Sequence, residues 1–112
     1  MDINVRRRGT VNVLQLKGNL TLGDPVNSFR SAVTELMQAG DTAFVVDLAG
    51  VAKMDSSGIG VLVNTLTASR KQGGNVKLVN PSEFARKTLQ LVGVLNLFET
   101  FDREDAAVES YG

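Results

Sequence analysis

The sequence contains neither cysteine nor histidine in its 112 residues. Without cysteine there can be no disulfide bond and no thiol chemistry. Without histidine the chain lacks the commonest general base and the commonest zinc ligand, so a Ser-His-Asp triad cannot form. We therefore expect a protein that is not an enzyme, with no catalytic residue, no metal site and no cofactor.

The sequence also lacks an excess charge and a long apolar run. Lys plus Arg and Asp plus Glu number 12 each, which gives no electrostatic reason to expect nucleic acid or an anionic membrane as a partner. We attribute the one basic run, Arg6-Arg7-Arg8, to a strand end and turn. No apolar run approaches the roughly 20 residues of a membrane span, and Met1–Asn4 does not resemble a signal peptide. The expected localisation is cytoplasmic.

The first forty residues predict a β-hairpin followed by a helix. Strands are expected at Ile3–Arg8 and Val11–Lys17, joined by a turn at Gly9-Thr10. Residues 18–23 follow as a loop or a short extended piece. Asp24-Pro25 then places an N-cap and a first-turn proline at the start of a helix. Apolar residues recur at helical spacing after it: Val26, Phe29, Val33, Leu36 and Met37.

The middle of the chain predicts a central strand and a second amphipathic helix. Ala43–Leu48 is apolar except for one aspartate, which suits a buried strand. Ala49–Lys53 is interpreted as a loop. A helix is expected from Gly58 to the Gly73-Gly74 pair, with one apolar stripe formed by Ile59, Leu62, Val63 and Leu66.

The last third predicts two more strands and two more helices. A strand at Val76–Val79 precedes a helix that Asn80 caps and Gly93 ends. A strand or extended piece follows at Val94–Phe98, and Asp102 caps a final short helix. We assign three phenylalanines of this region to the core or its lid: Phe84, Phe98 and Phe101.

These elements predict an α/β fold in one domain, residues 1–112. The order β-β-α-β-α-β-α-β-α implies right-handed crossovers between parallel strands, to which the opening hairpin adds one antiparallel pair. We expect a mixed, mostly parallel sheet of four to five strands with about four helices. Helices should cover one face of the sheet well and the other poorly.

One motif, Asp55-Ser56-Ser57-Gly58, lies where a strand meets a helix. Its simplest interpretation is a helix cap. However, Gly58 and Gly60 each weaken a helix by about 1 kcal/mol relative to alanine, and small residues let another molecule approach the backbone. The carboxyl end of a strand is also where open α/β sheets bind ligands. The motif is therefore a candidate functional site.

Two enzymatic interpretations of this motif are weak. The nucleophile elbow of serine hydrolases is Gly-x-Ser-x-Gly, which the chain does not contain. A Ser-Lys pair through Lys53 has nothing else in its favour. Gly58-Ile59-Gly60 alone is too short for a nucleotide-binding fingerprint.

The stretch from Asp47 to Leu62 resembles the signature of STAS domains, specifically of bacterial anti-sigma factor antagonists. The resemblance implies partner switching. The unphosphorylated antagonist binds an anti-sigma factor that is also a serine kinase, phosphorylation by that kinase abolishes binding, and a PPM-type serine phosphatase reverses it. The implied phosphoacceptor is Ser56, with Ser57 as runner-up. The same family also supplies subunits of stress-signalling assemblies and lipid-transport systems, which remain the alternative.

Elementary electrostatics explains why such a site could work as a switch. A phosphate adds about −1.5 to −2 charges beside Asp55. We expect the helix dipole and the N–H groups of Gly58 and Ile59 to compensate this charge within the domain. An acidic partner surface would be repelled, with no large conformational change.

The expected docking surface comprises the motif, the loop before the first helix and part of the motif helix. Val61 falls off the apolar stripe and is therefore a candidate contact. The chain has Gly18-Asn19-Leu20-Thr21 where many family members have Gly-Glu-Leu-Asp, so a weaker phosphorylation or a different partner is possible. We expect a monomer or weak dimer. The predicted partner-binding residues are Thr21, Leu22, Gly23, Met54, Val61 and Asn64.

Overall fold

The computed structural model describes all 112 residues, and their element order matches the predicted one. The α/β fold class is thereby confirmed. The short 3-10 helix η1 before the last strand is an addition to the predicted set. The elements are β1 (Asp2–Arg8), β2 (Val11–Leu20), α1 (Asp24–Gln38), β3 (Ala43–Met54), α2 (Ser56–Lys71), β4 (Asn75–Val79), α3 (Glu83–Val92), η1 (Leu95–Leu97), β5 (Thr100–Phe101) and α4 (Glu104–Glu109).

The five strands form one sheet in the order β1-β2-β3-β4-β5. The β1–β2 hairpin is antiparallel, and the other three pairings are parallel. Gly9 takes φ of 64° in the two-residue turn between Arg8 and Val11, a conformation that glycine adopts without strain. β3 is central, as its apolar sequence predicts. The mixed, mostly parallel sheet is confirmed.

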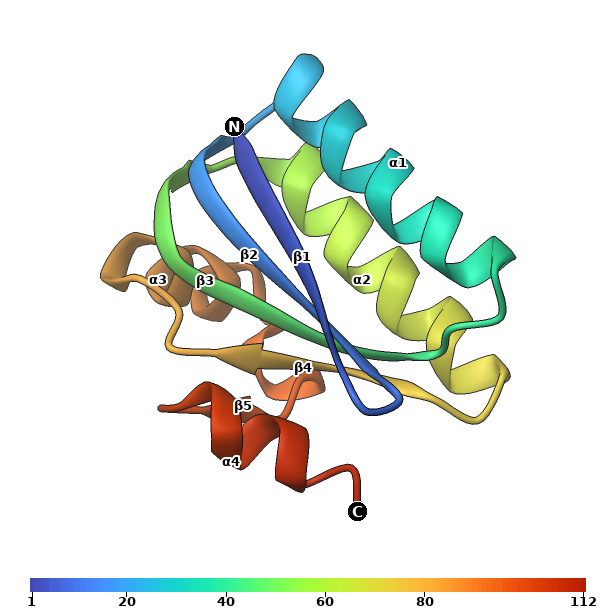
Figure 1. Cartoon of the computed structure of the whole chain (residues 1–112). Coiled ribbons are helices and arrows are strands. Elements are labelled where there is room, and N and C mark those ends of the chain that lie inside the picture. The colour runs from blue at the N-terminus through green and yellow to red at the C-terminus, as the bar shows by residue number, and fades with distance from the viewer.

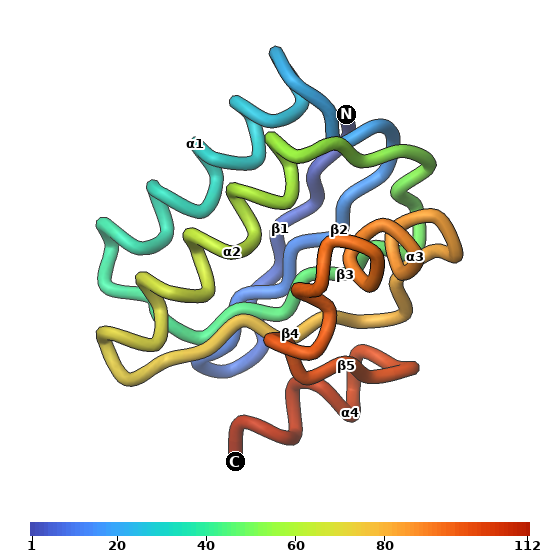
Figure 2. The backbone as a smooth tube through the Cα atoms, turned by 180° about the vertical axis from the view of Figure 1, so that it is seen from behind, coloured from blue at the N-terminus to red at the C-terminus, as the bar shows by residue number.

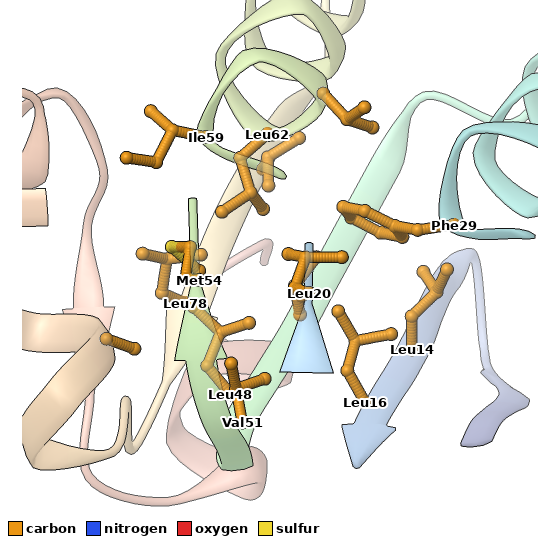
Figure 3. Packing of buried hydrophobic residues seen from close by; sticks show 14 of the residues in the cluster. Leu14, Leu16, Leu20, Phe29, Leu48, Val51, Met54, Ile59, Leu62 and Leu78 are labelled. Carbon is orange, nitrogen blue, oxygen red and sulfur yellow. The ribbon is translucent and has the colours of Figure 1, made fainter. Parts of the chain in front are cut away.

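Helices α1 and α2 lie side by side over one face of the sheet (Figure 1). Between them and the strands lies a core cluster of 20 buried residues, to which α3 also contributes Ala85 and Leu89. Figure 3 shows Leu14, Leu20 and Met54 projecting from the strands toward Phe29 and Leu62 of the helices. This core fixes the start of α2 above the carboxyl ends of β2 and β3.

The opposite face of the sheet is covered only by the C-terminal segment, which lies below β4 and β5 in Figures 1 and 2. A small cluster of five buried residues includes Ala107 of α4 and Val45 of β3. The Tyr111 hydroxyl lies 2.6 Å from the carbonyl oxygen of Phe44 and 2.8 Å from that of Asn75. The expectation of one well-covered and one poorly covered face is therefore met.

Ion pairs connect this C-terminal segment to β1. Arg6 and Arg8 donate to the Glu104 carboxylate, and Arg8 also donates to Asp105 at 2.6 Å. Arg7 pairs with Asp41 at 2.9 Å. All three residues of the basic run are thus paired within the chain.

Two strands extend further than predicted. Residues 18–20 continue β2, and the interpretation of Ala49–Lys53 as a loop is wrong because β3 runs to Met54. The two extensions pair with one another, Leu20 opposite Met54, across two register shifts. Pairing between the strands therefore continues both of them past Gly18 and Gly50.

Three predicted helix caps are wrong by one or two residues. Gly23 rather than Asp24 is the N-cap of α1, and Arg103 rather than Asp102 is that of α4. Ser82 rather than Asn80 caps α3, accepting a hydrogen bond from the Ala85 N–H. The Asn80 N–H instead donates to the Phe101 carbonyl, so Asn80 ends the β4–β5 pairing.

The C-terminal third departs from prediction in two further places. The strand or extended piece expected at Val94–Phe98 is instead occupied by η1, and β5 begins at Thr100. Phe98 is buried and Phe101 is half-buried, but Phe84 is 46% exposed and does not belong to the core. The α3 face that packs on the sheet is formed by Ala85 and Leu89.

Candidate functional site

The predicted site lies where β3 meets α2. Asp55 follows the last residue of β3 and is the N-cap of α2, and Ser56 is the first residue of that helix. Ser56 is exposed and Ser57 is half-buried. A modifying enzyme would therefore reach the Ser56 hydroxyl more easily, in keeping with the predicted ranking of the two serines.

The Asp55 carboxylate connects the start of α2 to the loop between β2 and α1 by accepting three backbone hydrogen bonds. Its Oδ1 accepts hydrogen bonds from the N–H groups of Ser57 at 3.0 Å and Gly58 at 3.3 Å. Its Oδ2 accepts one from the N–H of Leu22 at 2.9 Å. These bonds, first among them the one from Leu22, hold the pKa of the Asp55 carboxyl below its usual value because they stabilise the charged form. We call this arrangement the Asp55 clasp.

Sequence reasoning placed Asp55 beside the predicted phosphoacceptor but missed the clasp to Leu22. An aspartate before a helix signals an N-cap, and this part of its role was predictable. The contact with a residue 33 positions earlier was not, because it depends on β2 and β3 ending side by side.

The amides expected to compensate a phosphate already have acceptors. The Gly58 N–H donates to the Asp55 carboxylate, and the Ile59 N–H donates to the Asp55 carbonyl oxygen at 3.1 Å. The predicted compensation through these two N–H groups is therefore wrong for the structure as it stands. A phosphate on Ser56 would have the helix dipole near it but not these amides.

The two glycines of the motif serve different purposes. A Cβ at Gly58 would lie 2.6 Å from the carbonyl oxygen of Leu20, whereas a Cβ at Gly60 would meet nothing within 4 Å. Gly58 therefore permits α2 to pack on β2, and the prediction that it leaves room for another molecule is wrong. Gly60 borders open space, and the approach of another molecule at this position stays a prediction.

The predicted partner-binding residues divide into exposed and buried sets. Leu22 is 77% exposed, Asn64 is exposed, and Thr21 and Gly23 are half-buried. Met54 and Val61, by contrast, are only 5% and 4% exposed, and both belong to the core cluster. Their prediction as partner contacts is corrected.

The reasons for the two errors are structural. Val61 lies off the apolar stripe that faces the sheet, but it lines a groove together with Val33 and Met37 of α1, the helix that lies beside α2 (Figure 1). Met54 is the last residue of β3 and points toward α2, as Figure 3 shows. The exposed surface is thus made by Leu22 and its loop, Ser56, Gly60 and Asn64.

The structure contains no group of three or more acidic, histidine or cysteine side chains placed to bind a metal ion. No helix is both long enough and apolar enough to cross a lipid bilayer. The site therefore consists of a hydroxyl, a hydrogen-bonded carboxylate and an exposed apolar side chain.

Comparison with known proteins adds a family and a fold. The family model described as STAS domain matches residues 2–107. An anti-sigma-B factor antagonist of Bacillus subtilis (strain 168) is 34% identical over 97% of this chain and 100% of its own length. The anti-sigma factor antagonist SpoIIAA in its unphosphorylated form has a TM-score of 0.85 at 23% identity, covering 98% of this chain and 96% of its own.

The phosphorylated form of SpoIIAA, described as a Bacillus cell fate determinant, is also similar. Its TM-score is 0.80 at 22% identity, covering 99% of this chain and 100% of its own. At this identity the two SpoIIAA structures establish a common fold. The assignment to a family rests on the family model that matches residues 2–107 and on the Bacillus subtilis relative.

Alanine substitution at the two glycines should shift stability in opposite directions. Gly58→Ala should lower the free energy of unfolding by about 1–3 kcal/mol because the new methyl group meets the Leu20 carbonyl. Gly60→Ala should raise it by about 0.5–1 kcal/mol because alanine favours the helix. Urea denaturation measures both. Equal effects at the two positions would contradict this assignment.

Removal of the Asp55 carboxylate should destabilise the protein in a pH-dependent way. The folded-state pKa lies below the unfolded value of about 3.9. The stabilisation is therefore complete well above that unfolded value and is lost as pH falls through the folded pKa. Asp55→Ala should unfold at lower urea than wild type at about pH 7, and the difference should shrink toward about pH 2.5.

Asp102→Ala is the matched control for this measurement, because Asp102 is exposed and is not the cap of α4. It should leave the urea midpoint close to that of wild type at about pH 7. A difference between Asp55→Ala and wild type that stays constant with pH would contradict stabilisation by the charged carboxylate.

Proposed function

This chain belongs to the STAS domain family, and on that basis we propose that it is an anti-sigma factor antagonist controlled by phosphorylation of Ser56. The Bacillus subtilis relative is named for this activity. In the proposed cycle the unphosphorylated protein binds an anti-sigma factor with serine kinase activity, and so frees a sigma factor. Phosphorylation by this kinase ends the binding, and a PPM-type serine phosphatase restores it.

The observation that carries the proposal is the exposure of Ser56 at the start of α2. A phosphoacceptor must be accessible to two different enzymes, and its modification must not disturb the core. The Ser56 hydroxyl forms no hydrogen bond within the chain, whereas the neighbouring carboxylate is held by three. The hydroxyl is therefore free to react while the turn that presents it is fixed.

The effect of a phosphate on binding follows from charge. The group would lie beside a carboxylate whose low pKa keeps it ionised, and the amides of Ser57 and Gly58 already donate to that carboxylate. About two negative charges would therefore be added to an acidic spot and would act on whatever lies against it. A partner surface packed on Leu22 and Ser56 would have to desolvate that charge, which is costly.

The same arguments support a binding module in preference to an enzyme. The motif has no base next to its serines, and Asp55 is fully engaged in backbone hydrogen bonds. Nucleophilic catalysis by serine requires an adjacent base that can accept its proton. In our proposal Ser56 is a substrate of other enzymes.

Phosphorylation should be confined to Ser56. Incubation with the cognate anti-sigma factor kinase and ATP should add one phosphate to the wild type and to Ser57→Ala, but none to Ser56→Ala, because of the two serines of the motif Ser56 is exposed and Ser57 is half-buried. Intact-mass spectrometry measures the incorporation. Loss of the phosphate in Ser57→Ala and its retention in Ser56→Ala would move the site to the runner-up.

A fixed negative charge at the phosphoacceptor should weaken binding without unfolding the protein. Ser56→Asp should raise the dissociation constant for the anti-sigma factor at least about tenfold, equivalent to about 1.4 kcal/mol, with an unchanged thermal midpoint. Thr67→Asp adds the same charge to an exposed position further along α2 and should bind like wild type. Equal affinities for Ser56→Asp and wild type, by isothermal titration calorimetry, would contradict electrostatic exclusion.

A further inference from the structure

A groove lies between α1 and α2, and we call it the α1–α2 groove. Its rim includes Arg30 and Thr34 of α1 and Asn64 of α2, all three of them exposed. Met37 and Ala68, which are half-buried, give it apolar surface. Its volume is about 210 Å³, whereas sites for drug-sized molecules measure about 300–1,000 Å³. The groove therefore suits a side chain of another protein better than a small molecule.

The groove continues the exposed surface of Ser56. Ser56, Gly60 and Asn64 follow one another at intervals of four residues on α2, so they lie on one side of that helix. A Cβ at Gly60 would meet nothing within 4 Å, so no other part of the chain stands at this point between Ser56 and the groove. Eight residues of helix place Asn64 about 12 Å from Ser56 along the helix axis.

A partner that binds at Ser56 is large enough to reach the groove. A standard protein–protein interface buries about 800 Å² on each partner, a patch about 30 Å across. Centred on Ser56, such a patch extends about 15 Å in each direction and passes Asn64. The Asp55 clasp holds the loop before α1 beside the start of α2, and the two helices run side by side from there (Figure 1). One interface can therefore include both Leu22 and the groove.

The groove has one charged residue, Arg30, whose charge is not neutralised within the chain. Its guanidinium donates a hydrogen bond to the Asn27 side chain at 3.0 Å but forms no ion pair. Helix α2 contains no aspartate or glutamate. The residues three and four positions from Arg30 on its own helix are uncharged: Val26, Asn27, Val33 and Thr34. The groove thus presents a positive charge beside an apolar surface.

We propose that the α1–α2 groove is a second contact for the anti-sigma factor, in which the groove takes an aliphatic side chain of that partner and Arg30 pairs with a carboxylate beside it. This inference rests on the proposed function and names the chemistry of the partner surface, an aspartate or glutamate next to an aliphatic residue. The planar guanidinium of arginine can bind a carboxylate through two parallel hydrogen bonds.

An acidic partner surface also fits the direction of the proposed switch. A phosphate on Ser56 repels a partner of its own sign and attracts one of the opposite sign. An acidic surface gains nothing from the ionised Asp55 carboxylate, but the uncompensated charge of Arg30 attracts it. Arg30 therefore favours binding by the same acidic surface that a phosphate on Ser56 would repel.

Reversal of the charge at Arg30 tests the ion pair. Arg30→Glu should raise the dissociation constant of the unphosphorylated full chain for the anti-sigma factor at least about tenfold, because like charges then meet in the interface. Isothermal titration calorimetry measures it, and an unchanged thermal midpoint shows that the variant is folded. Arg103→Glu is the matched control, since Arg103 is exposed in the C-terminal segment on the other face of the sheet, and it should bind like wild type.

A bulky uncharged residue at the rim tests the groove itself. Thr34→Tyr places a ring at the edge of the groove and should raise the dissociation constant at least about fivefold by blocking the aliphatic side chain of the partner. Ser31→Tyr adds the same ring to an exposed position of α1 that does not line the groove, and it should bind like wild type. Equal affinities of Thr34→Tyr and wild type would overturn the proposal.

Exchange of the two charges identifies the partner residue. Single Asp→Lys and Glu→Lys changes are made at the exposed acids of the anti-sigma factor. At the acid that meets Arg30, the change should weaken binding to the wild type and restore binding to Arg30→Glu, because the ion pair forms again with its charges exchanged. Absence of restoration at every exposed acid would overturn the ion pair.

The two proposals can be told apart by their failures. An anti-sigma factor that does not bind the wild type would end the proposed function, and this inference with it. Binding of the wild type that phosphorylation of Ser56 abolishes, together with an unchanged affinity of Arg30→Glu, would overturn this inference alone.

Discussion

The Asp55 clasp is the contact on which the arrangement of the site depends. One carboxylate accepts hydrogen bonds from two amides at the start of α2 and from the Leu22 amide in the β2–α1 loop. The clasp can form only because β2 and β3 end at the same level, with Leu20 opposite Met54. It in turn fixes the exposed Leu22 beside Ser56. Leu22 and Ser56, which are distant in sequence, thereby form one continuous surface.

The clasp also determines how a charge added at Ser56 would act. Many helix N-termini offer free amides to an incoming anion, but here Asp55 already uses the Ser57 and Gly58 amides. A phosphate would therefore be stabilised less by its own domain than the bare motif suggests. Its charge would act mainly on the solvent and on a docked partner. A switch needs an effect that is directed outward, and a capped helix provides it.

The sequence predicted the order of strands and helices better than the contacts between them. Apolar periodicity and glycine positions were sufficient for the order of strands and helices, because both depend on local conformation. The burial of Val61 depends on α1, and the extension of β3 through Ala49–Lys53 depends on pairing with β2. Neither the burial nor the extension can be predicted from the few residues that lie next to it in the sequence. The exposed serine was predictable because a cap lies at a helix end, whereas the contact from Leu22 was not.

The same separation of local and distant effects applies to charge. Arg6-Arg7-Arg8 stands out in the sequence as the one basic run, yet acids from residues 41, 104 and 105 neutralise it in the fold. The pairs with Glu104 and Asp105 also connect α4 to β1, and the hydrogen bonds from Arg6 and Arg8 lower the pKa of Glu104. Each such pair on the surface contributes little by itself, but together they neutralise all three arginines of β1. The C-terminal helix thus supplies the acids that neutralise Arg6 and Arg8 of the N-terminal strand, although the two lie at opposite ends of the sequence.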